Sequence, residues 1–361
     1  MVFPLYNRNK LTNGNKTTFF NATIITLNMW NADGTATPAQ MGGGDGLWST
    51  TSPVWTDASA SITAAMTPQP GFAIFGGTPG AVTIDNSFGQ TSALGMQFLV
   101  DGYLLTGNVL QLDNGGDPSI ISVGPSANFT TTITNSLTGN NGINKTGTGI
   151  LVLSGTNTYI GTTILTAGVL SVSANNNLGA APNSLDFEGG ILESTAPFTM
   201  DRTTTLGAAG GTFLTDSGTV LTQNGIISGL GTLNKTGLGT LVLNDAANNY
   251  NGGTTVNDGT LQAGVAGALV NNTNYTINAG TLDLNNFDLI MSSLVGSGGS
   301  IDAGTATLTV NQTTDTDYAG TILGSNLFVK SGAGRLEGTG TVGNTTVSGT
   351  IAPGGPGEIA H

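Results

Sequence analysis

A unit that occurs more than once constrains this chain more than any other feature of its sequence. KTGTGILVLSG begins at Lys145 and KTGLGTLVLND begins at Lys235, and each copy is followed by a Tyr-x-Gly element, at Tyr159 and Tyr250. A shorter copy, KSGAG, begins at Lys330. Repeated units fold alike and contact mainly their neighbours in the chain, so these copies predict a linear stack of similar elements.

Short runs of β-branched and aliphatic residues lie between turn-forming Gly, Asn and Asp residues along the chain. Examples are AVTI at 81–84, IISV at 120–123, TTV at 254–256 and TLTV at 307–310. Such runs predict strands of about four to six residues. No stretch combines an apolar spacing of three and four with N-cap and C-cap residues, so we expect little helix.

The short strands, the 57 glycines and the repeated units favour an all-β chain that forms a right-handed parallel β-helix (β-solenoid), in which each coil stacks on the next. Val, Leu and Ile should point inward, Thr, Ser and Asn should point outward, and glycine should supply positive φ at the corners. A set of β-sandwiches is the alternative fold, because its turns recur at a similar spacing. The positions that we predict to repeat for structural reasons are Lys145, Gly147, Gly149, Tyr159, Lys235, Gly237, Gly239, Tyr250, Tyr318, Lys330, Gly332 and Gly334.

The repeated lysines precede a Gly-x-Gly corner each time, which indicates an architectural role. We expect their aliphatic stems to lie across the coil below and their ammonium groups to reach turn carbonyls or solvent.

The aromatic residues divide the chain into parts. All three tryptophans, Trp30, Trp48 and Trp55, precede residue 60. The first coil of a solenoid exposes strand edges and an open core, which bulky aromatic residues can cover. We therefore predict an N-terminal segment with a possible extra strand at 1–28, an aromatic-rich N-terminal cap with the first coils at 29–140, and the repeat-bearing solenoid at 141–361.

Charge and composition exclude several classes of protein. Lys+Arg number 8 against 21 Asp+Glu, for a net charge of −13, and no basic residue lies between Lys16 and Lys145. This negative field opposes binding to nucleic acid. The chain has no cysteine, and its one histidine is His361, so disulfides, thiolate metal sites and histidine-based catalysis are not expected.

The targeting signals of an exported protein are not evident in the chain as given. It has no run of eighteen apolar residues, so we expect no direct membrane insertion, and its start lacks the apolar stretch of a signal peptide. We expect it to be a piece of a longer protein.

At the residues of the repeated unit, the sequence closely resembles the autotransporter-associated β-strand repeat. The resemblance runs over roughly 29–357 and ends at GTIAPG, residues 349–354, which is similar to the closing element of that family. It implies a right-handed β-helix and a passenger region of bacterial type V secretion, placed outside the cell or on the bacterial surface. The signal peptide and the C-terminal translocator barrel of a complete autotransporter are not found in this sequence, and the repeat implies architecture rather than an activity.

Catalytic β-helices use clustered carboxylates, and this chain has a few acidic groups to consider. Two glycine-aspartate turns, at Asp45 and Asp117, resemble calcium loops but lack a nonapeptide period. Arg202 and Arg335 are the only arginines beyond the N-terminal segment, so a basic partner for catalysis is scarce. We expect solvated acids, no enzyme activity, no cofactor and no metal. The acids considered as a catalytic cluster are Asp186, Glu188, Glu193, Asp315 and Asp317.

A long polar surface with a negative field suits extended contacts with other macromolecules. The leading hypothesis is therefore a binding or adhesion module for host or neighbouring-cell proteins or glycans, present as a monomer or associated end to end. A structural protein that assembles into filaments or a surface layer is the alternative, and a polysaccharide-acting β-helix enzyme is third.

Overall fold

The alternating runs of the sequence form short strands with one buried and one partly exposed face. In β14 (Ile150–Leu153), Leu151 and Leu153 are buried, whereas the two residues between and before them are partly exposed. The equivalent strand of the second copy, β25 (Thr240–Leu243), has the same pattern. The predicted inward and outward positions are therefore those of the folded chain.

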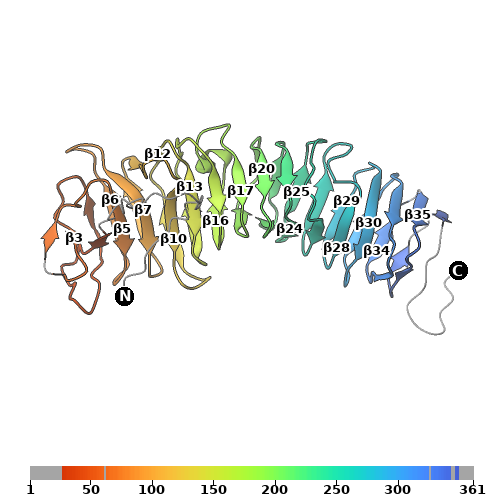
Figure 1. The fold of residues 1–361 in the computed structure, drawn as a ribbon, viewed down its shortest axis with the longest axis horizontal. Coiled ribbons are helices and arrows are strands. Elements are labelled where there is room, and N and C mark those ends of the chain that lie inside the picture. Colours follow the sequence, from red (N-terminus) through yellow and green to blue (C-terminus); the bar gives the residue numbers. More distant parts are fainter. Residues whose placement is uncertain (1–26, 61, 325–326, 343–345, 349–361) are drawn as a thin grey trace, which may run out of the picture.

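The computed structural model describes residues 27–60, 62–324, 327–342 and 346–348. Over these residues the chain forms an elongated, gently curved rod, with strands that lie across its long axis (Figure 1). The strands are grouped into sheets of 13, 15, 8 and 2 strands.

The 13-stranded sheet contains β1 (Leu27–Trp30), β3 (Trp55–Thr56), β4 (Thr63–Ala64), β5 (Gly71–Phe75), β7 (Ser92–Phe98), β9 (Leu110–Leu112), β10 (Ser119–Val123), β12 (Leu137–Gly139), β13 (Ile143–Thr146), β15 (Thr163–Leu165), β17 (Leu185–Phe187), β20 (Thr204–Leu206) and β23 (Ile227–Gly229). The 15-stranded sheet contains β2 (Gly46–Trp48), β6 (Ala81–Ile84), β8 (Leu104–Gly107), β11 (Thr130–Ile133), β14, β16 (Val169–Val172), β18 (Ile191–Ser194), β21 (Gly211–Thr215), β24 (Leu233–Thr236), β26 (Thr254–Val256), β28 (Thr273–Ile277), β30 (Leu289–Val295), β32 (Leu308–Asn311), β35 (Leu327–Ser331) and β38 (Thr346–Ser348).

The 8-stranded sheet contains β19 (Phe198–Met200), β22 (Val220–Gln223), β25, β27 (Thr260–Ala263), β29 (Thr281–Asp283), β31 (Ser300–Asp302), β34 (Thr321–Leu323) and β37 (Thr341–Val342). The remaining pair is β33 (Thr316–Asp317) with β36 (Leu336–Glu337).

Strands of successive coils pair in parallel, which confirms the predicted all-β fold, a parallel β-solenoid. Ile150 of β14, for example, lies opposite Val169 of β16, which in turn lies opposite Ile191 of β18. β-Sandwiches are built from antiparallel sheets, so the alternative fold is wrong. Helix is scarce as expected: within the described residues it is limited to the 3-10 turn η1 (Asn175–Leu178).

An aromatic cluster fills the first coils, as predicted for the N-terminal cap. The ring centroids of Trp30 and Trp55 are 5.1 Å apart, those of Trp48 and Trp55 are 4.9 Å apart, and Phe75 lies within 5.9 Å of all three tryptophans. Here the pairing becomes antiparallel, because β3 pairs antiparallel with both β1 and β4. The 13-stranded sheet thus ends in a strand of two residues, which leaves little edge for another chain to pair with.

The first described strand crosses one of the predicted boundaries. β1 includes Leu27 and Asn28 and pairs in parallel with β5, so these two residues belong to the solenoid sheet. The rest of the predicted N-terminal segment, and the predicted closing element at 349–354, lie outside the described residues.

The two complete copies of the repeated unit occupy different faces of the rod. In the first copy, β13 belongs to the 13-stranded sheet and β14 to the 15-stranded sheet, whereas in the second copy β24 belongs to the 15-stranded sheet and β25 to the 8-stranded sheet. The interval between the copies is therefore not a whole number of coils. The second copy is displaced by one face around the rod axis.

Candidate functional site

The repeated lysines point into the core rather than to solvent. Lys145 lies in an inward column between Ile121 and Leu165, and Lys235 lies between Phe213 and Val256. Both lysine side chains are fully buried.

Each buried ammonium group binds three backbone carbonyls at a corner. Lys145 Nζ donates to the carbonyl oxygens of Thr146 at 2.9 Å, Gly147 at 2.9 Å and Ala167 at 3.0 Å. Lys235 Nζ donates to the equivalent set, Thr236 at 2.7 Å, Gly237 at 2.7 Å and Asp258 at 3.2 Å. The third acceptor in each set belongs to the following coil, so the lysine fastens one coil to the next.

The shortened copy keeps part of this arrangement. Lys330 on β35 is also buried, and its Nζ donates to the carbonyl of Ser331.

Burial has an electrostatic cost at these corners. Removal from water lowers the pKa of Lys145 to about 8 and that of Lys235 to about 8, and it also lowers the pKa of Lys330. The carbonyl oxygens around Lys145 and Lys235 act against this lowering of the pKa, because their hydrogen bonds favour the charged ammonium group. At neutral pH Lys145 and Lys235 stay protonated, and each binds three carbonyl oxygens. These two lysines are therefore placed to stabilise the rod and are not accessible to an external ligand.

The two glycines of each Gly-x-Gly corner are needed for different reasons. The first has positive φ, +73° at Gly147, +73° at Gly237 and +76° at Gly332. The second, at Gly149, Gly239 and Gly334, does not have positive φ, so the expectation of positive φ does not extend to it. A Cβ atom at Gly239 would lie 2.2 Å from the carbonyl oxygen of Asp216, and the equivalent distances at Gly149 and Gly334 are 2.6 and 2.2 Å from a carbonyl of the preceding coil. Close approach of the coils excludes a side chain there.

The first two repeated tyrosines are buried and equivalent. Tyr159 Oη lies 2.7 Å from Thr163 Oγ1, and Tyr250 Oη lies 2.8 Å from Thr254 Oγ1. Tyr318 precedes its lysine instead of following it, and its hydroxyl donates only weakly, at 3.5 Å, to the carbonyls of Gly299 and Thr321. It therefore packs by itself, outside the arrangement of the two complete copies.

Two asparagines with a repeated role were not identified from the sequence. Asn157 Oδ1 accepts a hydrogen bond from Leu137 N of the preceding coil at 2.8 Å, and its Nδ2 donates to the carbonyl of Asn177 in the following coil. Asn248 bonds Ile227 N and the carbonyl of Ala268 in the same way. The signal was present, because an Asn stands two residues before the tyrosine in both copies.

The acidic residues considered as a catalytic cluster do not converge on one site. Asp186 lies on β17 of the 13-stranded sheet and Glu193 on β18 of the 15-stranded sheet, with the exposed Glu188 in the turn between them. Asp315 and Asp317 are exposed near the C-terminal end of the rod. Asp315 Oδ1 accepts a hydrogen bond from the backbone N–H of Arg335.

The aspartates of the two glycine-rich turns also have local structural roles. Asp45 Oδ1 accepts a hydrogen bond from Ala81 N at 2.7 Å, and the backbone of Asp117 closes a turn onto Asn114 O. No group of three or more acidic or histidine side chains able to hold a metal ion occurs in the part of the chain that the structure describes.

Neither arginine beyond the N-terminal segment is placed to act on a substrate together with these acids. The guanidinium of Arg202 is buried and donates to Asn175 Oδ1 and to the carbonyls of Asn175, Gly179, Ala180 and Asn183, so it holds the loop around η1 in place. Arg335 forms an exposed ion pair with Glu337 at 3.2 Å.

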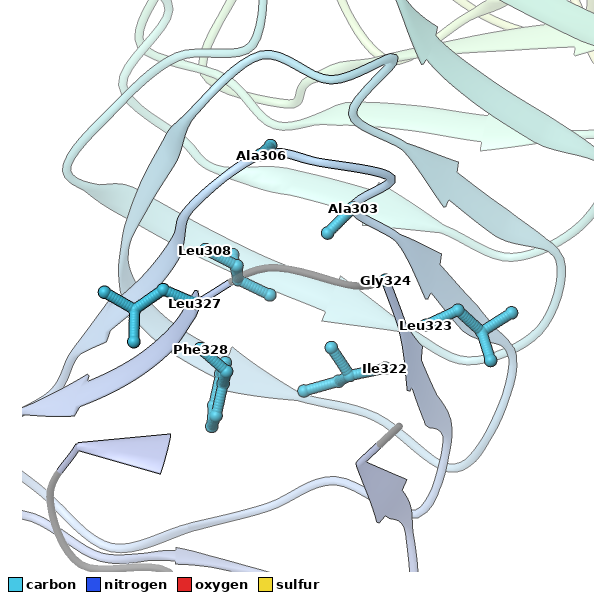
Figure 2. A pocket seen from close by; sticks show the side chains of 8 residues that line it. All are labelled: Ala303, Ala306, Leu308, Ile322, Leu323, Gly324, Leu327 and Phe328. Carbon is cyan, nitrogen blue, oxygen red and sulfur yellow. The ribbon is translucent and has the colours of Figure 1, made fainter. Parts of the chain in front are cut away.

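The apolar pocket in the last coils is a gap in the core. Figure 2 shows Ile322, Phe328 and Leu308 pointing toward its centre, while Leu323 and Leu327 point away from it. Ala303 and Ala306 leave the space on the remaining side. Its volume of about 10 Å³ is close to the minimum for one water molecule, so it does not accommodate an organic ligand.

A second hollow opens on the surface near the N-terminal end and has a volume of about 690 Å³. It lies where three successive strands of the 15-stranded sheet, β6, β8 and β11, end. Polar side chains of three coils come together there, although nothing in the sequence marks them as neighbours. Its lining consists of Asn86, Ser87, Gln90, Gly107, Asn108, Val109 and Ser136.

Comparisons with known proteins agree with the repeated units. A family model described as the passenger-associated-transport-repeat matches residues 143–172 and 233–263, which contain both lysine corners. The adhesin BmaC autotransporter of Brucella suis biovar 1 (strain 1330) is 40% identical over 247 residues, which make up 67% of this chain and 7% of that relative. The chain thus spans a small part of the relative's length. No solved structure matches it. In the described residues, no helix has the length and apolarity needed to cross a membrane.

Proposed function

Because this chain is a passenger region of an autotransporter, built with passenger-associated-transport repeats and placed outside the bacterial cell or on its surface, we propose that it is a binding module for adhesion. Its proposed partners are proteins or glycans of host or neighbouring cells. The observation that carries the proposal is the 40% identity, over 247 residues, to a protein named as an adhesin.

The surface of the rod supports this proposal. Inward positions hold the aliphatic residues, so the sheets turn partly exposed Thr, Asn and Ser residues outward, and the corners carry polar turns. With a net charge of −13, such a rod stays soluble and projects its corners along its whole length.

We propose a role without catalysis. The carboxylates considered for catalysis lie on separate faces or at the far end of the rod, and the guanidinium of Arg202 is fully engaged in the fold. The alternative of rods that associate end to end is less well supported, because antiparallel pairing closes the N-terminal end of the 13-stranded sheet.

Binding of the fluorescently labelled chain to cultured epithelial cells and to bacterial cells, measured by flow cytometry, tests the proposal. We expect saturable binding that unlabelled chain competes away, and a monomer by light scattering. An unrelated acidic protein, such as serum albumin, is the control for nonspecific binding. Binding no stronger than that of albumin on every surface would refute adhesion, and ordered fibres in negative-stain micrographs would favour the structural alternative.

A further inference from the structure

Within the proposed adhesion function, on which this inference rests, we propose that the polar hollow near the N-terminal end binds neutral glycans. The hollow is formed by Asn86, Ser87 and Gln90 of one turn, by residues 107–109 and by Ser136, which belong to three successive coils. Its volume of about 690 Å³ is open to solvent, so it suits a ligand that rests on the surface rather than one that is enclosed.

Hydrogen bonds hold the lining in position before any ligand binds. Asn86 Nδ2 and Gln90 Nε2 both donate to the carbonyl of Val109, each at 2.9 Å. Asn86 Oδ1 accepts from Thr91 N at 2.9 Å, and Asn108 Oδ1 accepts from Asn86 N at 3.0 Å. Such preorganisation reduces the entropy lost on binding, which matters most for weak ligands.

The lining also retains polar groups that can bond a ligand. Asn108 Nδ2 has no acceptor among the described residues, and Gln90 Oε1 has only a long contact with Asn86, at 3.5 Å. The hydroxyls of Ser87 and Ser136 donate to Asp85 and Thr156 and keep their lone pairs free to accept. Neutral donors and acceptors side by side match the hydroxyl groups of a sugar.

An exposed aromatic ring stands in the same turn. Phe88 is 68% exposed, and Thr50 Oγ1 anchors the turn by donating to the carbonyl of Phe88 at 2.9 Å. Phe88 does not line the hollow itself, but it lies in the chain between the lining residues Ser87 and Gln90. Aromatic rings combine a large apolar surface with defined stacking geometry, so Phe88 offers a platform beside the hollow for the C–H face of a pyranose.

The charge of the region selects between classes of glycan. No charged residue lines the hollow, and the carboxylate beside it, Asp85, has a pKa lowered by the hydrogen bond from the Ser87 hydroxyl. The ionised carboxylate and the net charge of −13 repel sialylated or sulfated sugars. A protein partner is disfavoured because a specific protein interface needs an apolar centre and about 1,000 Å² of buried area.

A printed array of neutral and sialylated glycans, probed with the labelled full chain, tests the inference. An open hollow binds a single sugar weakly, so the biotinylated full chain is presented on labelled streptavidin, where several hollows engage the displayed glycans together. We expect binding to a group of neutral glycans. The signal should fall at least about fivefold for Asn108→Ala, which changes the lining, and for Phe88→Ala, which removes the proposed platform beside it.

Leu238→Ala is the matched control, because Leu238 is exposed to a similar degree, 66%, but lies at the corner between β24 and β25. Circular dichroism and the thermal unfolding midpoint establish that the variants are folded. Asn108→Asp, of nearly the same size, should also lose binding, because it replaces the free Nδ2 donor with a charged acceptor.

The outcomes separate this inference from the adhesion proposal. Absence of glycan binding above background, binding that survives Phe88→Ala and Asn108→Ala, or preference for sialylated glycans would each overturn the inference. If the chain then still binds cells, the adhesion proposal stands, and another surface of the rod contacts the partner, for example a protein on the cell. If it binds neither, both proposals fail.

Discussion

At the scale of single residues, the buried lysines show how a chain with few charges uses them. Lys145 and Lys235 are removed from water, which is costly for a cation, and each offsets part of that cost with three carbonyl oxygens from two coils. A carbonyl buried without a donor is itself costly, so the lysine and its corner depend on each other.

Replacing Lys235 with methionine tests this dependence. Methionine fills the same inward space but leaves the carbonyls of Thr236, Gly237 and Asp258 without their common donor. We expect a loss of about 1–3 kcal/mol in the free energy of unfolding, measured by urea denaturation at pH 7. Arg335→Met, at an exposed side chain, is the control and should change stability by less than about 0.5 kcal/mol. Equal stability of the two variants would contradict the fastening role.

The lysines also predict a pH dependence. Between pH 8, near the pKa of Lys145 and Lys235 in the folded chain, and pH 10.5, the ordinary pKa of lysine, the unfolded chain binds more protons than the folded chain. The contribution of these lysines to stability therefore rises with pH over this interval. Tyr250 has the opposite effect and lowers stability as the pH rises above 10.0, the ordinary pKa of tyrosine, because burial raises its pKa to about 12 and the folded chain then holds the proton.

Comparing the parent chain with a variant that lacks both lysines separates the effect of the lysines from that of the tyrosines. The urea midpoints of the parent chain and of a Lys145→Met, Lys235→Met double variant should be followed from pH 7 to 10, since the tyrosines are common to both. We expect the midpoint of the parent to rise relative to the variant above pH 8. A difference that is independent of pH would show that the ammonium groups titrate alike in the folded and unfolded chain.

At the scale of the elements, the corners decide how closely the coils stack. Gly237 and Gly218 have nearly the same φ, +73° and +76°. A Cβ atom at Gly237 would lie 2.4 Å from the carbonyl oxygen of Thr215, whereas nothing lies within 4 Å of one at Gly218. The effect of a positive φ can therefore be measured at Gly218 separately from the effect of a close neighbouring coil at Gly237.

Three alanine substitutions use this difference. Gly218→Ala should cost about 1 kcal/mol from its φ alone. Gly237→Ala should cost more, because a backbone carbonyl must also move, and Gly239→Ala should be costly through the contact with Asp216 O despite its ordinary φ. Thermal unfolding midpoints rank the three. A Gly218→Ala variant as unstable as Gly237→Ala would mean that φ by itself governs these corners.

At the scale of the whole molecule, the rod is a one-dimensional stack whose end needs protection. The three tryptophans and Phe75 close the core at the N-terminal end, and β3 and β4 close the edge of one sheet. In such a stack each coil is stabilised mainly by its neighbours, so damage at one end should remain local.

Trp55→Ala tests this locality. Removing a buried indole should destabilise the first coils by about 3–5 kcal/mol. Hydrogen exchange should show lost protection in β2, β5 and β6, with β25 and β27 unchanged. Tyr250→Phe, in the middle of the rod, is the control and should leave the first coils unchanged. Uniform loss of protection along the rod after Trp55→Ala would indicate a single cooperative unit.

Much of the architecture could be predicted from the sequence, because it repeats locally. The alternation of Leu151 and Leu153 with outward residues, and the Lys-x-Gly-x-Gly corner, recur wherever the same coil geometry recurs. The tryptophans indicated the capped end because large aromatic residues have few other uses in a chain of small side chains.

Tertiary structure alone decided which residues of different coils meet. The interval between the two copies of the repeated unit is not a whole number of coils, so the second copy lies one face further around the rod. Stacking of successive coils brings Asn86, Asn108 and Ser136 into one hollow, whereas the turn between β17 and β18 places Asp186 and Glu193 on separate sheets. The local pattern determines that a coil forms, but the length of every preceding turn determines where on the rod each side chain lies, because the stacking register of a solenoid is additive along the chain.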